Sequence, residues 1–195
     1  MAVALSACGT SETSGNGGPG RIAYQTTRYG ALDIVAIDAS GKNFKRLTTH
    51  LGDDGWPTWS PDTLHIAFQS DRAPTTRFQI YVMNAADGTG PVNLTNNPAT
   101  DWGPAWSRDG SKIAFYSNRE LDFAIWVMNS DGSNPVRLTN PAIQAGLPDW
   151  SADNTRIAYE QDGHLWVMDA DGSHKVQITS GRAVVDGVPR WRPVP

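Results

Sequence analysis

The chain is poor in several features that would assign it to a familiar class of protein. A single cysteine among 195 residues excludes an intrachain disulfide framework. No apolar run approaches the roughly 20 residues that a membrane-spanning helix needs. Lys and Arg form no cluster and the formal net charge is −4, so the sequence carries no nucleic-acid-binding footprint. What remains has the length of one domain.

The motifs of several enzyme classes are missing as well. The sequence has no G-x-S-x-G of a serine hydrolase, no H-E-x-x-H and no phosphate-binding loop of the G-x-x-x-x-G-K type. Its Cys and His residues are not clustered. We therefore expect a protein that is not an enzyme and has no cofactor and no metal site.

Four short Pro-x-Trp segments organise the rest of the sequence. Their tryptophans, spaced 47, 44 and 41 residues apart, are Trp59, Trp106, Trp150 and Trp191. Between them recur an Ile-Ala-aromatic segment, a hydrophobic segment ending in Val-Met, a Gly turn, and a Leu-Thr or Ile-Thr pair. A period of about 40–50 residues that holds four short strand patterns is typical of a β-propeller blade. The sequence therefore predicts an all-β propeller.

The first repeat, residues 21–48, lacks a Pro-x-Trp strand, and the spare copy lies near the other end of the chain, at Pro189–Trp191. An open first blade would leave an unpaired strand edge, so we expect this segment to complete it. The prediction is a four-bladed propeller of four-stranded antiparallel blades over residues 21–195, closed by the C-terminal strand. The alternative is that two chains exchange their ends into a larger ring. Of the two, we expect the monomer.

The first 20 residues predict an export signal and a tether. Leu5-Ser6-Ala7-Cys8 is similar to a bacterial lipobox, in which the cysteine is lipidated, although only seven residues precede Cys8 and none is Lys or Arg. The Ser-, Gly- and Thr-rich run that follows has nothing to bury and predicts a flexible tether. We expect a truncated lipoprotein signal and an exported protein, periplasmic or at the cell surface. The alternative is an incidental cysteine in a disordered tail.

The repeat as a whole resembles a known one. Pro-x-Trp-Ser-Pro-Asp, Ile-Ala-Phe-x-Ser-x-Arg, Ile-Tyr-Val-Met-Asn, Asp-Gly and Leu-Thr, over about residues 21–193, resemble the WD-like repeat of the TolB C-terminal propeller. The resemblance implies a non-enzymatic, protein-binding role at the cell envelope. TolB-type proteins have six blades and a separate N-terminal domain, whereas this sequence shows four repeats.

Acidic residues recur five positions before the tryptophans of the innermost strands. They pair in the repeat pattern with arginines between the second and third strands, as Asp54 with Arg72, Asp101 with Arg119 and, across the termini, Asp186 with Arg28. The fourth repeat loses both members together, with Ala145 and Asp162 at these positions. Because a metal-binding acidic ring has no reason to lose an arginine in step, we interpret the residues as structural ion pairs. The alternative is an acidic ring that holds a cation.

Two tryptophans depart from the repeat in the loops that lead into innermost strands, Trp56 and Trp102. We expect them on one face with His50 and His164. Aromatic rings near a concave mouth can anchor a peptide or stack on a sugar. The plainer interpretation is that they pack over loop residues and seal the rim.

The sequence thus predicts a non-catalytic binding module that engages a protein or peptide at the cell envelope. One alternative is a carbohydrate-binding or carbohydrate-active propeller. Another is a fragment of a larger propeller protein.

Overall fold

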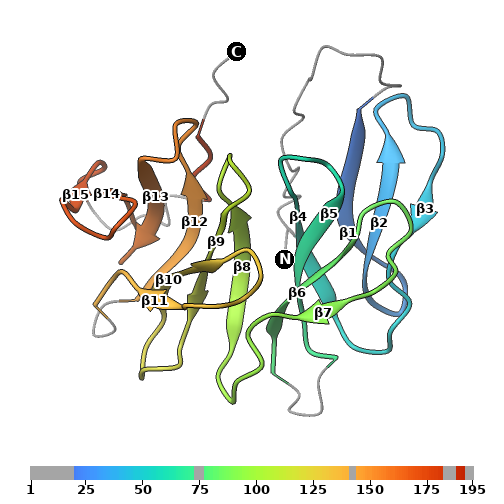
Figure 1. Ribbon diagram of the computed structural model, residues 1–195, viewed down its shortest axis with the longest axis horizontal. Helices are drawn as coiled ribbons and strands as arrows, with labels where there is room; N and C mark the ends of the chain where they lie inside the picture. The colour runs from blue at the N-terminus through green and yellow to red at the C-terminus, as the bar shows by residue number, and fades with distance from the viewer. Residues whose placement is uncertain (1–19, 73–76, 141–143, 182–187, 192–195) are drawn as a thin grey trace.

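The computed structural model describes residues 20–72, 77–140, 144–181 and 188–191, and in these ranges every regular element is a β-strand. The strands form four antiparallel sheets, one for each sequence repeat (Figure 1). In the order of the chain, the sheets consist of β1 (Arg21–Tyr29), β2 (Ala31–Asp38) and β3 (Lys45–Arg46); β4 (Asp54–Trp59), β5 (His65–Ser70), β6 (Gln79–Asn84) and β7 (Val92–Asn93); β8 (Asp101–Trp106), β9 (Lys112–Ser117), β10 (Ala124–Asn129) and β11 (Val136–Arg137); and β12 (Ala145–Trp150), β13 (Arg156–Gln161), β14 (His164–Asp169) and β15 (Val176–Gln177).

This arrangement confirms the predicted all-β fold with four propeller blades. The second, third and fourth blades have four strands each, and the first has three. No helix in the described ranges could cross a membrane.

The recurring Thr of each repeat fastens the strand that pairs with the outer strand of its own blade. Its hydroxyl accepts the backbone N–H of a hydrophobic residue of that strand, over 2.8–3.0 Å. The four pairs are Thr48 with Ile34, Thr95 with Ile80, Thr139 with Ile125, and Thr179 with Leu165. The outer strands have only two residues, so the hydroxyl satisfies an amide that the short strand does not reach.

The core consists of clusters that each lie between two consecutive blades. Each cluster is formed by one side of the preceding sheet and the opposite side of the following sheet. One side carries small and aliphatic residues, such as Ala67 and Ile80, and packs toward the following blade. The other side carries the Ile-x-aromatic residues, such as Ile113 and Phe115, and packs toward the preceding blade. The same pairing of sides forms the first and third inter-blade cores. Because both sides of an internal blade are covered, its central strands are hydrophobic at successive positions.

In the second, third and fourth blades, the Gly of the turn before the outer strand also makes an inter-blade contact. Gly132 has φ +87, a conformation that favours glycine, and a Cβ there would lie 2.7 Å from the Leu94 carbonyl of the preceding blade. Gly88 meets Leu47 and Gly172 meets Leu138 in the same way. A Cβ at Gly41, in the first blade, would have no other atom within 4 Å.

Each innermost strand contains a bulge just before its Pro-x-Trp segment. The residue before the proline has positive φ in all three blades, at Trp56, Gly103 and Leu147. At the first two positions the backbone N–H points to the preceding blade and donates to a glutamine side chain, Gln25 for Trp56 and Gln69 for Gly103. The bulge therefore links neighbouring blades as well as bending its own strand.

The structure does not show the predicted closure. Within the described residues β1 pairs only with β2, and residues 188–191 form no strand. Inter-sheet packing joins consecutive blades, and the first and fourth sheets lie at opposite ends of the molecule in Figure 1, blue at the right and orange-red at the left. Trp191 lies against the fourth blade, where its backbone N–H donates to Asp149 Oδ2 at 2.6 Å.

Candidate functional site

The loops that precede the innermost strands and the loops that join second to third strands emerge together at one end of the blades, which we call the loop face. Asp54, at the start of β4, is fully buried here and binds the Arg72 guanidinium through both carboxylate oxygens at 2.8 Å. Arg72 also donates to Ser70 Oγ and lies over the rings of Phe68 and Tyr81 at 5.0 and 5.2 Å. The carboxylate is therefore enclosed by its own blade.

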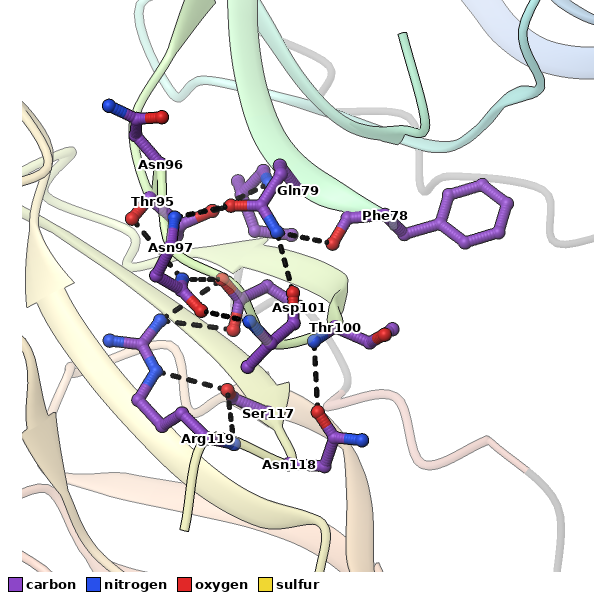
Figure 2. Close-up of polar contacts among 12 residues, drawn as sticks. Phe78, Gln79, Thr95, Asn96, Asn97, Thr100, Asp101, Ser117, Asn118 and Arg119 are labelled. Atoms are coloured by element: carbon purple, nitrogen blue, oxygen red, sulfur yellow. Dashed lines mark hydrogen bonds and ion pairs between the residues drawn. The ribbon is translucent and has the colours of Figure 1, made fainter. Parts of the chain in front are cut away.

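The third blade repeats this arrangement with one addition (Figure 2). Asp101 accepts from Arg119 at 3.0 and 3.1 Å and from the Asn97 side chain at 2.5 Å. Asn97 belongs to the loop before β8, and its backbone N–H donates to Gln79 Oε1, so the pair also organises that loop. The Arg119 side chain is 17% exposed and that of Asp101 is fully buried. Both carboxylates are occupied by protein groups and are poorly placed to hold a cation.

The third pair expected from the sequence falls partly outside the described residues, since Asp186 lies there. Arg28 is exposed, and its guanidinium lies over the Phe44 ring at 5.2 Å. The first blade instead contains an ion pair that the sequence did not predict, between buried Asp33 and Arg46 at 2.8 Å. In the fourth blade Ala145 is buried and Asp162 is exposed. Cys8 lies outside the described residues too.

A cluster of aromatic rings, which we call the aromatic rim, lies on the loop face of the second and third blades. Trp102 stacks on Phe123 with centroids 5.0 Å apart, and it meets Phe78 and Tyr116 edge to face at 6.0 and 5.8 Å. All four rings are half-buried. Phe78 comes from the second blade, so the cluster spans the junction between two blades. The pKa of Tyr116 rises to about 12 because of burial and the nearby Glu160 carboxylate, which keeps its hydroxyl neutral.

The two tryptophans lie inside strands rather than in the loops where the sequence had placed them. Trp102 is the second residue of β8, opposite Tyr116 of β9. Trp56 lies within β4 at the bulge, half-buried, with φ 52. This is a conformation that a bulky side chain rarely adopts, at a cost of order 1–3 kcal/mol. The third blade has Gly103 at the same position.

The two histidines are separated from the aromatic rim in their contacts. His50 is exposed and its Nδ1 accepts the Gly52 N–H at 3.0 Å, which stabilises the loop before β4. His164 is half-buried at the start of β14, and its Nδ1 is buried without a hydrogen-bond partner. Among the described residues, no group of three or more His, Cys, Asp or Glu is placed to hold a metal ion.

The opposite end of the blades carries the tight turns and a pocket of about 360 Å³ between the second and third blades. Asp62, Asp109 and Asp131 contribute to its lining. Each of these carboxylates accepts hydrogen bonds from Ser hydroxyl or backbone N–H groups of its own turn, which lowers its pKa. The recurring Ser-x-Asp and Asp-x-Ser sequences are thus explained by turn structure.

Comparison with known proteins matches the fold and repeat just described. Residues 74–194 match the family described as TolB beta propeller domain (PD40). The chain belongs to the TolB β-propeller family. The comparison with curated proteins found no match.

Solved structures agree with this assignment. The TolB-family chain superposes on a structure described as TolB from Agrobacterium tumefaciens with TM-score 0.74 and 25% identity, covering 80% of this chain and 60% of that one. TolB from Acinetobacter baumannii gives TM-score 0.67 and 20% identity, covering 84% and 42%. Oligogalacturonate lyase in complex with manganese gives TM-score 0.66 and 13% identity, covering 82% and 49%. The chain therefore spans less than two thirds of either TolB structure, and the fold also occurs in an enzyme.

Proposed function

We propose that this TolB-family propeller is a non-catalytic binding module that engages a protein or peptide through its loop face. The contact surface consists of Trp56 and the aromatic rim of Phe78, Trp102, Tyr116 and Phe123. Half-buried aromatic side chains supply large contact area with little loss of side-chain entropy, and Trp and Tyr are enriched among residues that dominate binding energy.

The observation that carries this proposal is the backbone conformation of Trp56. A bulky residue at positive φ costs stability, and the third blade forms the same bulge with Gly103. Strain of this kind persists where a side chain is retained for another purpose, and it is concentrated at functional sites. Leu147 has the same positive φ in the fourth blade, so the bulge accepts other side chains. The strain at Trp56 therefore does not by itself identify the ligand.

A substitution at this residue separates binding from stability. Trp56→Gly removes the ring and relieves the strain, so the melting temperature should stay the same or rise while ligand affinity falls. Ligands would be selected from a displayed library of random peptides and their affinities measured by fluorescence anisotropy. Leu64→Ala, at an exposed hydrophobic residue in the turn between β4 and β5, is the matched control and should change neither property.

The carbohydrate alternative is tested with the same variants on a glycan array. A glycan that binds the natural chain and is lost in Trp56→Gly and Trp102→Ala would favour a sugar-stacking surface over the peptide site. Selected peptides that bind equally well to both variants would contradict the role of this face. Turnover of oligogalacturonate with added manganese would contradict the non-catalytic assignment.

We further propose that the chain is exported and anchored by a lipid on Cys8, in the periplasm or at the cell surface. The lipobox-like sequence and the TolB family membership support this location. Metabolic labelling with an alkyne fatty acid should mark the natural chain and leave the Cys8→Ser variant unlabelled. Equal labelling of both would show that Cys8 is not the anchor.

A further inference from the structure

Among the described residues, no strand pairs with the inner edge of β1, where each other blade has one. In the three complete blades, the Trp of the Pro-x-Trp strand lies opposite the Ile of the Ile-Ala-aromatic strand. The pairs are Trp59 with Ile66, Trp106 with Ile113, and Trp150 with Ile157. By this register Trp191 should lie opposite Ile22, and Arg190 opposite Ala23.

The structure instead places Trp191 against the fourth blade. The backbone N–H of Trp191 donates to Asp149 Oδ2, and the Arg156 guanidinium lies over the Trp191 ring at 5.6 Å. Trp150 contacts the third blade through a different group, its indole N–H, which donates to the Ala105 carbonyl at 3.1 Å. Ala105 and Asp149 occupy the same repeat position.

The first blade exposes one half of an inter-blade core. Ile22, Tyr24 and Ile37 are partly exposed, although the corresponding residues of the other three blades are buried. Those buried residues are Ile66, Phe68 and Met83; Ile113, Phe115 and Met128; and Ile157, Tyr159 and Met168.

The fourth blade exposes the other half. Ala158 and Leu165 are partly exposed, although the corresponding residues of the other blades are fully buried. Those residues are Ala23, Ala67 and Ala114, and Ile34, Ile80 and Ile125. Ile178 of the outer segment is 58% exposed, whereas Leu47 is 5% exposed. The two ends of the chain therefore carry the complementary halves of an interface that the protein builds three times internally.

We propose that a second copy of this chain supplies the missing neighbour at each end. The first blade of one copy pairs β1 with Pro189–Trp191 of the other and packs on its fourth blade. The tail keeps the position that it has in this structure, so the joint forms without rearranging the fourth blade. Two such head-to-tail joints make a ring of eight blades, within the usual range of propellers.

The first and fourth blades of a single chain do not make this joint in the structure. They lie at opposite ends of the molecule, and inter-sheet packing runs between consecutive blades of the described chain (Figure 1). Closure within one chain would require the first blade to pack on the β13 and β14 side of the fourth blade, as the fourth blade packs through β12 on β8, β9 and β10. A second copy satisfies both ends at once with the same repeat contacts.

The first measurement is the solution mass of the full chain by light scattering, with Cys8→Ser to prevent adventitious oxidation. The expected mass is twice 21.1 kDa. A monomer at all accessible concentrations would overturn the proposal. Species larger than two chains would show that the contact repeats without closing, and would overturn the two-chain ring.

The second measurement tests the register between differently tagged chains, one with Ala23→Cys and the other with Arg190→Cys. Directly opposed residues of antiparallel strands have Cα atoms about 4.5–5.5 Å apart, which suits a disulfide. Mixed chains should form a covalent pair that carries both tags. Arg21→Cys, two residues along the same strand, is the control and should not link with Arg190→Cys. A disulfide only within a single chain that carries both substitutions would demonstrate closure in cis and refute exchange.

The third measurement uses the exposed hydrophobic side of the joint. Leu165→Lys should lower the dimer fraction at least tenfold while the circular dichroism spectrum stays that of a folded β protein. Leu64→Lys, far from both end faces in the repeat pattern, should leave the dimer intact. A dimer unaffected by Leu165→Lys would place the contact elsewhere.

Discussion

Breaking the Asp101–Arg119 ion pair tests how far the loop face depends on its buried charges. Asp101→Asn keeps the shape of the side chain and removes the charge. It leaves the Arg119 guanidinium beside an amide, and it places that amide 2.5 Å from the Asn97 side-chain nitrogen. The loop before β8 should therefore loosen together with the pair.

The expected loss in the free energy of unfolding follows from how deeply the Asp101–Arg119 pair is buried. Removing one partner of a buried ion pair costs about 3–5 kcal/mol. The Arg119 side chain keeps 17% exposure, so we expect the lower end, about 3 kcal/mol. For a domain of this size that corresponds to a fall in melting temperature of about 6–12 °C.

The assay is thermal unfolding of a double-mutant cycle, followed by circular dichroism at neutral pH. The two single variants of the cycle are Asp101→Leu and Arg119→Met, and each should destabilise because it leaves the other charge without its partner. Asp101→Leu combined with Arg119→Met should recover most of the loss, since a well-packed hydrophobic pair can replace a buried ion pair. The control is Glu120→Gln, which removes the half-exposed partner of Arg137 and should cost less than about 1 kcal/mol.

Two results would refute the reasoning. If Asp101→Asn cost no more than the Glu120→Gln control, the buried pair would not hold the loop. If the two single substitutions were additive in the cycle, the residues would not act on each other.

Three further predictions concern the blades and their turns. Thr139→Val should cost about 1–3 kcal/mol in urea unfolding, because the buried Ile125 N–H loses its acceptor; a neutral result would contradict this. Gly88→Ala should destabilise clearly more than Gly41→Ala, because both have positive φ but only Gly88 meets the preceding blade; equal losses of urea stability would argue against that contact. Hydrogen bonds within its turn lower the pKa of Asp153 to about 2, below the unfolded value. Its stabilisation is therefore complete above about pH 4 and is lost toward pH 2. Asp153→Asn should flatten this part of a melting-temperature profile, and an unchanged profile would exclude the turn as its source.

The repeat made the blades predictable, because each strand and turn is specified by neighbouring residues. The Leu-Thr pair, the Gly turn and the Pro-x-Trp segment each have a local role that recurs in the structure. The partners Asp54–Arg72 and Asp101–Arg119 could be proposed because their positions vary together from one repeat to the next. Asp33–Arg46 could not, because it occurs only once and no repeat compares with it.

The surroundings of the two tryptophans depended on tertiary structure. Trp102 departs from the repeat, but its stack requires Phe78 from the blade before it and Phe123 from its own blade. The sequence also gave no sign that Trp56 has positive φ, because the bulge arises from pairing between strands.

By itself, the sequence determined four blades, the strand order within each and the mismatch between an incomplete first repeat and a spare final strand. Only the tertiary structure decided where those two ends lie. The physical reason is that their separation depends on the rotation from each blade to the next, which side-chain packing between whole sheets sets and which accumulates along the chain. No local motif encodes that sum, so Trp191 could be matched to Ile22 by its sequence and still lie on the fourth blade.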